Sequence, residues 1–183
     1  MSDGLSGQLL VAAPQLRDPN FYRTVVLILQ HTEEGALGVV LNRPTEVGLP
    51  EELAQWKGML APPGVVFAGG PVEAQTVICL GRKTSGGDLS GAKMICPGVA
   101  AVDLDMQPGS LSGISALRIF IGYAGWGKDQ LESEIGSRDW FIFAPKADDV
   151  TTAEPGELWR RVLRRQGETM AMLAHFPPHP SLN

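Results

Sequence analysis

The chain has 183 residues, 44% of them hydrophobic, and carries a formal net charge of −5. This length and composition predict one compact domain, residues 1–183, with a sizeable core. The acidic balance argues against a dedicated binder of nucleic acid or anionic membranes. No apolar stretch approaches the ~20 residues that cross a bilayer, and the N-terminal segment lacks the charged region of a signal peptide. We therefore expect a cytoplasmic protein that does not enter a membrane.

The first part of the chain predicts mainly β-structure. GQLLVAAP is a short apolar run typical of a strand, and the turn residues RDPNFYR separate it from TVVLILQH, a strand rich in β-branched residues. A short turn then leads to ALGVVLNRP, so residues 24–42 predict a hairpin that ends before Pro44. PEELAQW predicts a short helix that begins near Pro50 and ends before Gly58.

The next segments continue the strand pattern. Strand character recurs in GVVFAGGP, AQTVICLG, KMICPG, VAAVDLD and ALRIFIGYAG, and a long glycine- and serine-rich loop, KTSGGDLSGAK, interrupts it. No repeat or linker divides the chain. Because strands outnumber helices and tight turns join several of them, we expect an α+β domain with a mixed, largely antiparallel sheet flanked by helices.

The segment GYAGWGKDQLESEI follows a strand and resembles a phosphate-binding loop at first sight. However, Asp129 stands where the Walker pattern needs serine or threonine, and the glycine order differs from the dinucleotide pattern. Asp129 and Glu132 instead predict a capping box at the start of a helix. We interpret Gly122, Gly125 and Gly127 as a sharp strand-to-helix turn with positive φ, and we expect no nucleotide there.

The last clear helix has two distinct faces. Its apolar residues fall on one side at 100° per residue, and Gly167 follows as a stop. The opposite side is a stripe of four arginines. We favour a solvated face that complements the helix dipole, with a phosphate grip as the alternative. The apolar residues are Leu158, Trp159, Val162 and Leu163, and the stripe is Arg160, Arg161, Arg164 and Arg165.

Three ordered motifs resemble the YqgE/AlgH family of bacterial proteins. They are AAPQLRDPNFYRTVVLILQHTEEGALGVVLNRP, FAGGPV and GYAGWGKDQLESEI, and Trp140 and LWRRVLRRQG are also similar. The resemblance covers nearly the whole chain. It implies an α+β fold with a barrel-like sheet. The family is largely uncharacterised, some members carry a transcriptional-regulator label, and no catalytic residues are established to carry over.

Catalytic and metal motifs are sparse. No GxSxG elbow occurs, because GSLSG places Leu111 where the serine belongs. Two of the three histidines lie in the proline-broken tail HFPPHP, and neither HExxH nor a cysteine cluster is present. A serine–histidine–aspartate set assembled from distant segments stays open. Asp103 and Asp105 share a strand face, which we interpret as solvated, with a cation site as the alternative.

We therefore predict no catalytic residues, no metal and no cofactor. Cys79 and Cys96 lie in apolar contexts without CxxC spacing, so both are expected to be free thiols. The favoured function is a non-enzymatic binding or regulatory domain that acts through a small anionic ligand or a protein partner rather than through direct DNA contact. The alternative is an enzyme acting on a small anionic metabolite.

If a site exists, two strand ends are the candidate location. Asn42 and Arg43 offer an amide beside a planar guanidinium suited to carboxylate or phosphate, and Gly69 and Gly70 allow an anion to approach backbone N–H groups. The alternative is that Asn42 closes the hydrogen bonds of the turn and Arg43 pairs with a surface carboxylate.

Aromatic residues would form the walls of this candidate cleft. Tyr123 and Trp126 are presented by the glycine-rich segment, and the alternative is that both cover the core beneath it. His31, at the end of a predicted strand, completes the set of ligand- or partner-binding candidates. The hypothesis requires Arg43, Gly70 and Trp126 to lie around one concavity.

Overall fold

The computed structural model describes residues 4–87 and 89–182. Within these ranges the strands form one sheet in the order β6-β7-β5-β8-β3-β2-β1-β9, with β4 beside β8. The strands are β1 (Leu9–Ala12), β2 (Val25–Thr32), β3 (Gly35–Val40), β4 (Phe67–Ala68), β5 (Val72–Lys83), β6 (Ala92–Cys96), β7 (Val99–Val102), β8 (Ile114–Gly127) and β9 (Trp140–Phe143). The helices are η1 (Glu51–Met59), η2 (Pro108–Ser110), α1 (Gln130–Gly136), α2 (Ala147–Val150), η3 (Pro155–Glu157), α3 (Leu158–Arg164), α4 (Glu168–Leu173) and η4 (Pro180–Leu182).

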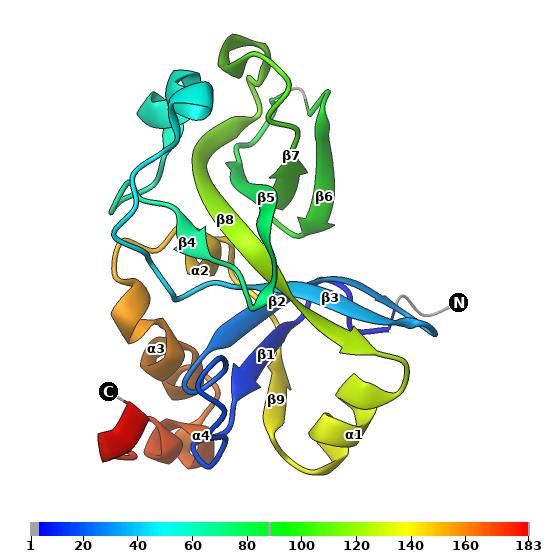
Figure 1. The fold of residues 1–183 in the computed structure, drawn as a ribbon, viewed down its shortest axis with the longest axis vertical. Helices are drawn as coiled ribbons and strands as arrows, with labels where there is room; N and C mark the ends of the chain where they lie inside the picture. Colours follow the sequence, from blue (N-terminus) through cyan, green and yellow to red (C-terminus); the bar gives the residue numbers. More distant parts are fainter. Residues whose placement is uncertain (1–3, 88, 183) are drawn as a thin grey trace.

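The long strand β8 joins the two halves of the sheet. Its first part pairs with β5 and its last part pairs with β3, both antiparallel. Figure 1 shows β8 running diagonally between the β5–β7–β6 half and the β3–β2–β1–β9 half. The short parallel pairing of β4 with β8 makes the sheet mixed. The sheet curls into an open half-barrel, and the predicted α+β class with a largely antiparallel, barrel-like sheet is confirmed.

The predicted hairpin at 24–42 is confirmed as β2 and β3. The two strands pair from Val26 opposite Val40 to Thr32 opposite Gly35, with one irregularity after Ile28. Both faces of β2 are covered over its first half, which explains why its sequence is nearly all apolar rather than alternating. The predicted glycine- and serine-rich loop follows β5, although Asp88 within it lies outside the described residues.

Apolar residues pack on both faces of the sheet. On one face Leu27 and Val39 pack with Trp159 of α3, and on the other face Val26 packs with Trp126 near α1. A third cluster forms inside the β5–β8 curl beneath η1. The predicted helix at PEELAQW is confirmed as the 3-10 helix η1, although η1 continues through Gly58 to Met59. The predicted apolar side of the last helix is the buried side of α3.

The predicted glycine-rich turn is wrong, because GYAGWG forms the end of β8. Gly125 and Gly127 pair with residues of β3, so this segment is a strand although its glycine-rich sequence is typical of a loop. Of the three glycines only Gly122 has positive φ, at 74°. A Cβ atom there would lie 2.6 Å from the Gly70 carbonyl oxygen, so the glycine permits close backbone contact.

The predicted capping box before α1 is also wrong. Asp129 adopts a left-handed conformation with φ 60° and makes no side-chain capping bond. A capping side chain normally comes from an extended residue, which places its oxygen over the first N–H groups of the helix. The Gly127 N–H donates to the side chain of Gln130 instead, and Glu132 contacts His31.

Both cysteines are buried free thiols, as predicted. Burial raises the pKa of Cys79 to about 12. Burial, together with the negative charge of Asp149, raises the pKa of Cys96 to about 11. Both thiols are therefore protonated at neutral pH and chemically inert in the folded chain. Across the described part of the chain, none of the helices has the length and apolar character needed to cross a membrane.

Candidate anion-binding pocket

Asn42 and Arg43 are both engaged with the backbone at the end of the β2–β3 hairpin. The Val25 N–H donates to Asn42 Oδ1 at 3.0 Å, and Asn42 Nδ2 donates to the Arg23 carbonyl at 2.9 Å. Arg43 Nη2 donates to the Tyr22 carbonyl at 2.6 Å, and burial lowers the pKa of Arg43. Asn42 therefore closes the turn, as the alternative expected. Arg43 contacts a carbonyl where that alternative expected a carboxylate.

Gly69 and Gly70 allow two backbone segments to cross at short distance. The Gly69 N–H donates to the Ile121 carbonyl, and the Val40 N–H donates to the Gly69 carbonyl, both at 2.8 Å. A Cβ atom at Gly69 would lie 2.3 Å from the Gly122 carbonyl oxygen, and one at Gly70 would lie 2.1 Å from the carbonyl carbon of Tyr123. The fold itself uses the Gly69 N–H that the anion hypothesis assigned to a ligand.

Tyr123 and Trp126 line a common pocket of about 440 Å³ over β2, β3 and β8. Arg43 and Gly70 do not belong to its lining, so the structure brings together the aromatic candidates without the strand-end candidates. Trp126 is only 5% exposed, and its indole donates to Glu134 Oε2 at 2.9 Å. Trp126 therefore also covers the core, and a binding role for these residues stays a prediction.

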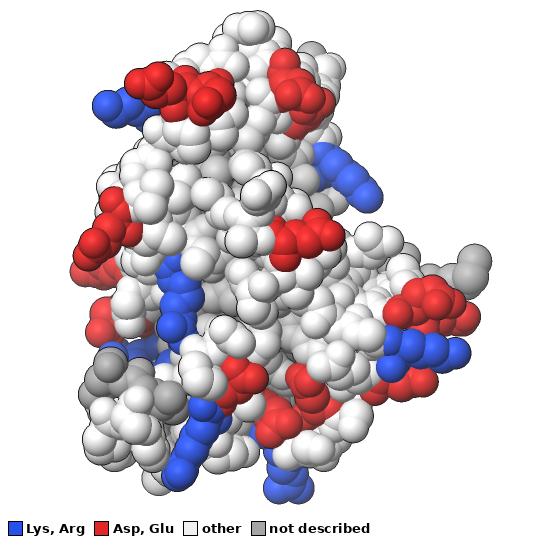
Figure 2. Space-filling view, in the orientation of Figure 1, with Lys and Arg blue, Asp and Glu red and all other residues white. Residues whose placement is uncertain are grey.

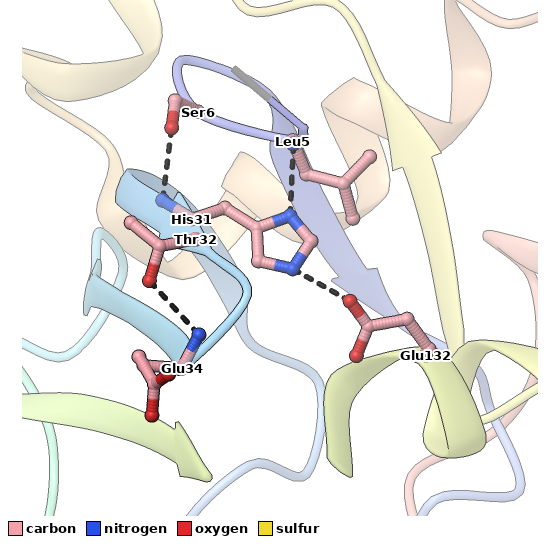
Figure 3. A network of polar contacts seen from close by, with 6 residues as sticks. All are labelled: Leu5, Ser6, His31, Thr32, Glu34 and Glu132. Atoms are coloured by element: carbon pink, nitrogen blue, oxygen red, sulfur yellow. Dashed lines mark hydrogen bonds and ion pairs between the residues drawn. The ribbon is translucent and has the colours of Figure 1, made fainter. Parts of the chain in front are cut away.

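His31 connects three segments of the chain (Figure 3). The Leu5 N–H donates to His31 Nδ1 at 3.0 Å, and the His31 backbone N–H donates to Ser6 Oγ at 2.9 Å. His31 Nε2 lies 2.7 Å from Glu132 Oε1 of α1. Because Nδ1 accepts, the neutral ring carries its proton on Nε2 and donates it to the carboxylate.

Glu132 is correspondingly stabilised as a carboxylate. A hydrogen bond from its own backbone lowers its pKa most, and the His31 contact lowers the pKa further. The contacts of His31 hold the N-terminal turn and α1 against β2. His31 is thus placed as a structural connector, and its proposed ligand role stays untested.

The arginine stripe of α3 divides between surface and pocket. Arg160 makes a 3.3 Å ion pair with Glu157, and Arg164 is exposed. Arg161 and Arg165 line a pocket of about 480 Å³ between β5, α2 and α3. The lining residues are Arg82, Lys146, Asp148, Asp149, Thr151, Thr152, Ala153, Arg161 and Arg165.

Two ion pairs occupy part of this pocket. Arg165 donates from both Nη atoms to the two oxygens of Asp149, each at 2.6 Å. Asp149 is 1% exposed and also accepts from the Lys146 backbone N–H at 2.8 Å. Arg82 Nη1 lies 2.6 Å from Asp148 Oδ1, at a more exposed position. Each carboxylate of the lining therefore has an arginine partner.

The lining nevertheless retains positive charge. Four cations and two carboxylates give it a formal charge of +2. The residues without an ion-pair partner, within the ranges that the structure describes, are Lys146 and Arg161. Arg161 Nη2 is buried and has no hydrogen-bond acceptor among the described residues. A buried donor of a charged group is costly when it has no acceptor, so the guanidinium of Arg161 is not fully satisfied by the protein.

A further cation lies beneath the pocket. Arg118 is 1% exposed and donates to the Thr152 carbonyl at 2.9 Å and to the Pro62 carbonyl at 2.5 Å. Its guanidinium carbon lies 4.1 Å from the centre of the Phe67 ring. Burial lowers the pKa of Arg118 to about 10, so it is still charged at neutral pH. Its charge adds to the positive potential around Thr152.

Sequence reasoning found only half of this pocket. The arginine stripe indicated Arg161 and Arg165, although the favoured interpretation was a solvated face. Arg82 and Lys146 come from other segments, and no motif links them to α3. Arg118 sits within an apolar strand pattern, and a lone charge in a buried run was the available signal.

Fold and pocket together define a class: an α+β half-barrel protein with a cationic pocket at the side of its sheet. A family model described as AlgH-like matches residues 9–171. The UPF0301 protein of Streptomyces avermitilis is 46% identical, covering 98% of this chain and 95% of the relative. That of Streptomyces coelicolor is 47% identical with the same coverage. The chain belongs to the AlgH-like UPF0301 family, which confirms the resemblance in the motifs.

Solved structures support the same assignment. A crystal structure of a protein from Corynebacterium diphtheriae is similar with a TM-score of 0.89 and 29% identity, covering 96% of this chain and 94% of the other. The solution structure of the AlgH protein from Pseudomonas aeruginosa has a TM-score of 0.69 and 28% identity, covering 98% of both chains. The half-barrel is therefore shared by these proteins.

Proposed function

We propose that this protein is a non-enzymatic binding domain whose ligand is a small anion held between β5, α2 and α3. The observation that carries the proposal is a pocket lining that retains a formal charge of +2, to which Arg161 contributes a guanidinium without an ion-pair partner among the described residues. The chain as a whole has a charge of −5, so this concentration of cations runs against its composition. A volume of about 480 Å³ lies in the range of small-molecule sites.

The side chains of the pocket favour binding over catalysis. No histidine, cysteine or serine is among the lining residues described above, and each carboxylate of the lining is held by an arginine. The buried carboxylate, Asp149, is held by the fork of Arg165 and by the Lys146 N–H. An enzyme acting on a small anionic metabolite is the rival function.

We further propose a regulatory role in the cytoplasm, exerted through a protein partner rather than through DNA. Acidic and basic side chains alternate in small clusters on the face in Figure 2, instead of forming the basic surface that DNA binding uses. The free thiols of Cys79 and Cys96 suit a reducing compartment. In this proposal, binding of the anion changes how the protein contacts its partner.

The test is a titration of the purified chain with phosphate- and carboxylate-bearing metabolites, measured by calorimetry in a buffer free of polyvalent anions. Arg161→Ala is expected to weaken the binding of a hit by at least about tenfold, because a charged hydrogen bond is lost. Arg164→Ala is the matched control, since Arg164 lies on the same helix, is exposed and does not line the pocket. Equal affinity of Arg161→Ala and the unaltered chain would contradict the proposal, and time-dependent conversion of the hit would establish the rival.

A further inference from the structure

Building on the proposed function, we infer that the ligand of this pocket is a small organic dianion. The inference rests on the charges that the pocket leaves uncompensated. Arg165 neutralises the charge of Asp149, and Arg82 neutralises the charge of Asp148. Two unit charges then remain in the lining, on Lys146 and Arg161. A ligand with two negative charges neutralises the lining, whereas a monoanion leaves one cation without a partner.

Buried cations near the pocket strengthen the attraction for negative charges on a ligand. Arg161 Nη2 is removed from solvent, and the buried Arg118 lies behind Thr152 at the pocket wall. Water screens Arg118 and Arg161 incompletely, so they attract a negative charge on the ligand more strongly than an open surface would. Lys146 is exposed, and its attraction is more fully screened. The two carboxylates of the lining repel a dianion only weakly, because Asp148 is paired with Arg82 and Asp149 with Arg165.

The available donors also suit an oxygen-rich anionic group. Arg161 contributes a planar fork, Lys146 a mobile ammonium group and Thr151 a hydroxyl, and they come from α3 and from the two ends of α2. Guanidinium and ammonium groups are the side chains that bind phosphate and carboxylate oxygens most strongly. The remaining volume accommodates an organic body attached to the charged group. The class therefore comprises phosphate monoesters and dicarboxylates.

The experiment compares matched dianions and monoanions at one ionic strength and pH 7.5. The probes are phenyl phosphate against methyl phenyl phosphate, and succinate against its monomethyl ester, each titrated by calorimetry. We expect at least one dianion to bind about tenfold or more tightly than its monoanionic partner, because one additional charge contact forms. The pair that shows the preference tells which of the two groups the pocket takes.

A variant assigns the preference to the pocket. Lys146→Met is expected to reduce the dianion-to-monoanion affinity ratio by about tenfold, since one of the two unpaired charges is removed. Arg164→Met should leave the ratio unchanged. If monoanions bind as tightly as dianions, or Lys146→Met leaves the ratio intact, the dianion inference is overturned while the anion-binding function stands. If none of the four probes binds, the dianion inference is overturned, and the wider metabolite titration then decides the proposed function separately.

Discussion

The two neighbouring aspartates of α2 offer a sharp test of the structure. Asp149 is 1% exposed and accepts from both Nη atoms of Arg165 and from a backbone N–H. Asp148 is 70% exposed at its side chain and meets one nitrogen of Arg82. The same substitution, aspartate to alanine, therefore removes a buried ion pair at one position and a solvated ion pair at the next.

The expected magnitudes differ clearly. Removing one partner of a buried pair costs roughly 3–5 kcal/mol, and the lower end applies here because the Arg165 side chain keeps 18% exposure. Asp149→Ala should therefore lower the free energy of unfolding by about 3 kcal/mol. For a chain of this size that corresponds to a fall of about 6–12 °C in Tm. Asp148→Ala should cost no more than about 1 kcal/mol, as exposed pairs do.

The assay is urea unfolding followed by tryptophan fluorescence, because the chain has four tryptophans and all four are buried. The buffer should contain no phosphate, since a bound anion would stabilise the folded state and mask the difference. A double variant, Asp149→Ala with Arg165→Met, should recover about 1 kcal/mol or more, because it removes the uncompensated charge. Equal losses for Asp148→Ala and Asp149→Ala would refute the assigned burial of the pair.

Three further predictions concern stability and reactivity. Gly69→Ala should destabilise the chain by about 1–3 kcal/mol in thermal melts, because a Cβ atom would lie 2.3 Å from a carbonyl oxygen of β8. Gly136→Ala is the control and should be neutral or stabilising, since a Cβ atom there would have no atom within 4 Å. Cys79 and Cys96 should react negligibly with a thiol reagent at pH 8 in the folded chain, and titration after unfolding should count two thiols; a count of none would show a disulfide. Folding lowers the pKa of Glu132 below its ordinary value of 4.5, so the ionised side chain stabilises the folded state at neutral pH and this effect is lost as the pH falls through the folded pKa. The difference in unfolding free energy between the unaltered chain and Glu132→Gln should therefore shrink in acid. A difference that grows in acid would contradict the assignment.

Several features of this protein follow from local sequence alone. The β2–β3 hairpin needs only two apolar, β-branched runs and a short turn, and α3 needs only a helical repeat of apolar residues. The apolar contexts of Cys79 and Cys96, together with the absence of CxxC spacing, predict free thiols. In each case the pattern that supports the prediction lies within one short stretch of sequence around each element or residue. The YqgE/AlgH motifs are likewise contiguous stretches, so family membership could be read without any coordinates.

Tertiary contacts decided the rest. GYAGWG resembles a turn by composition, yet β3 supplies the hydrogen-bond partners that make it a strand. The pocket assembles Arg82 of β5, Lys146 beside α2 and Arg161 of α3, and no local pattern encodes that the sheet curl and the packing of α2 bring them together. Whether a charge is paired depends on which distant side chain lies beside it. Arg165 forms an ion pair with Asp149, whereas Arg161 has no ion-pair partner among the described residues. Sequence determines where charges stand along a chain, but only the folded arrangement determines which of them are left without a partner.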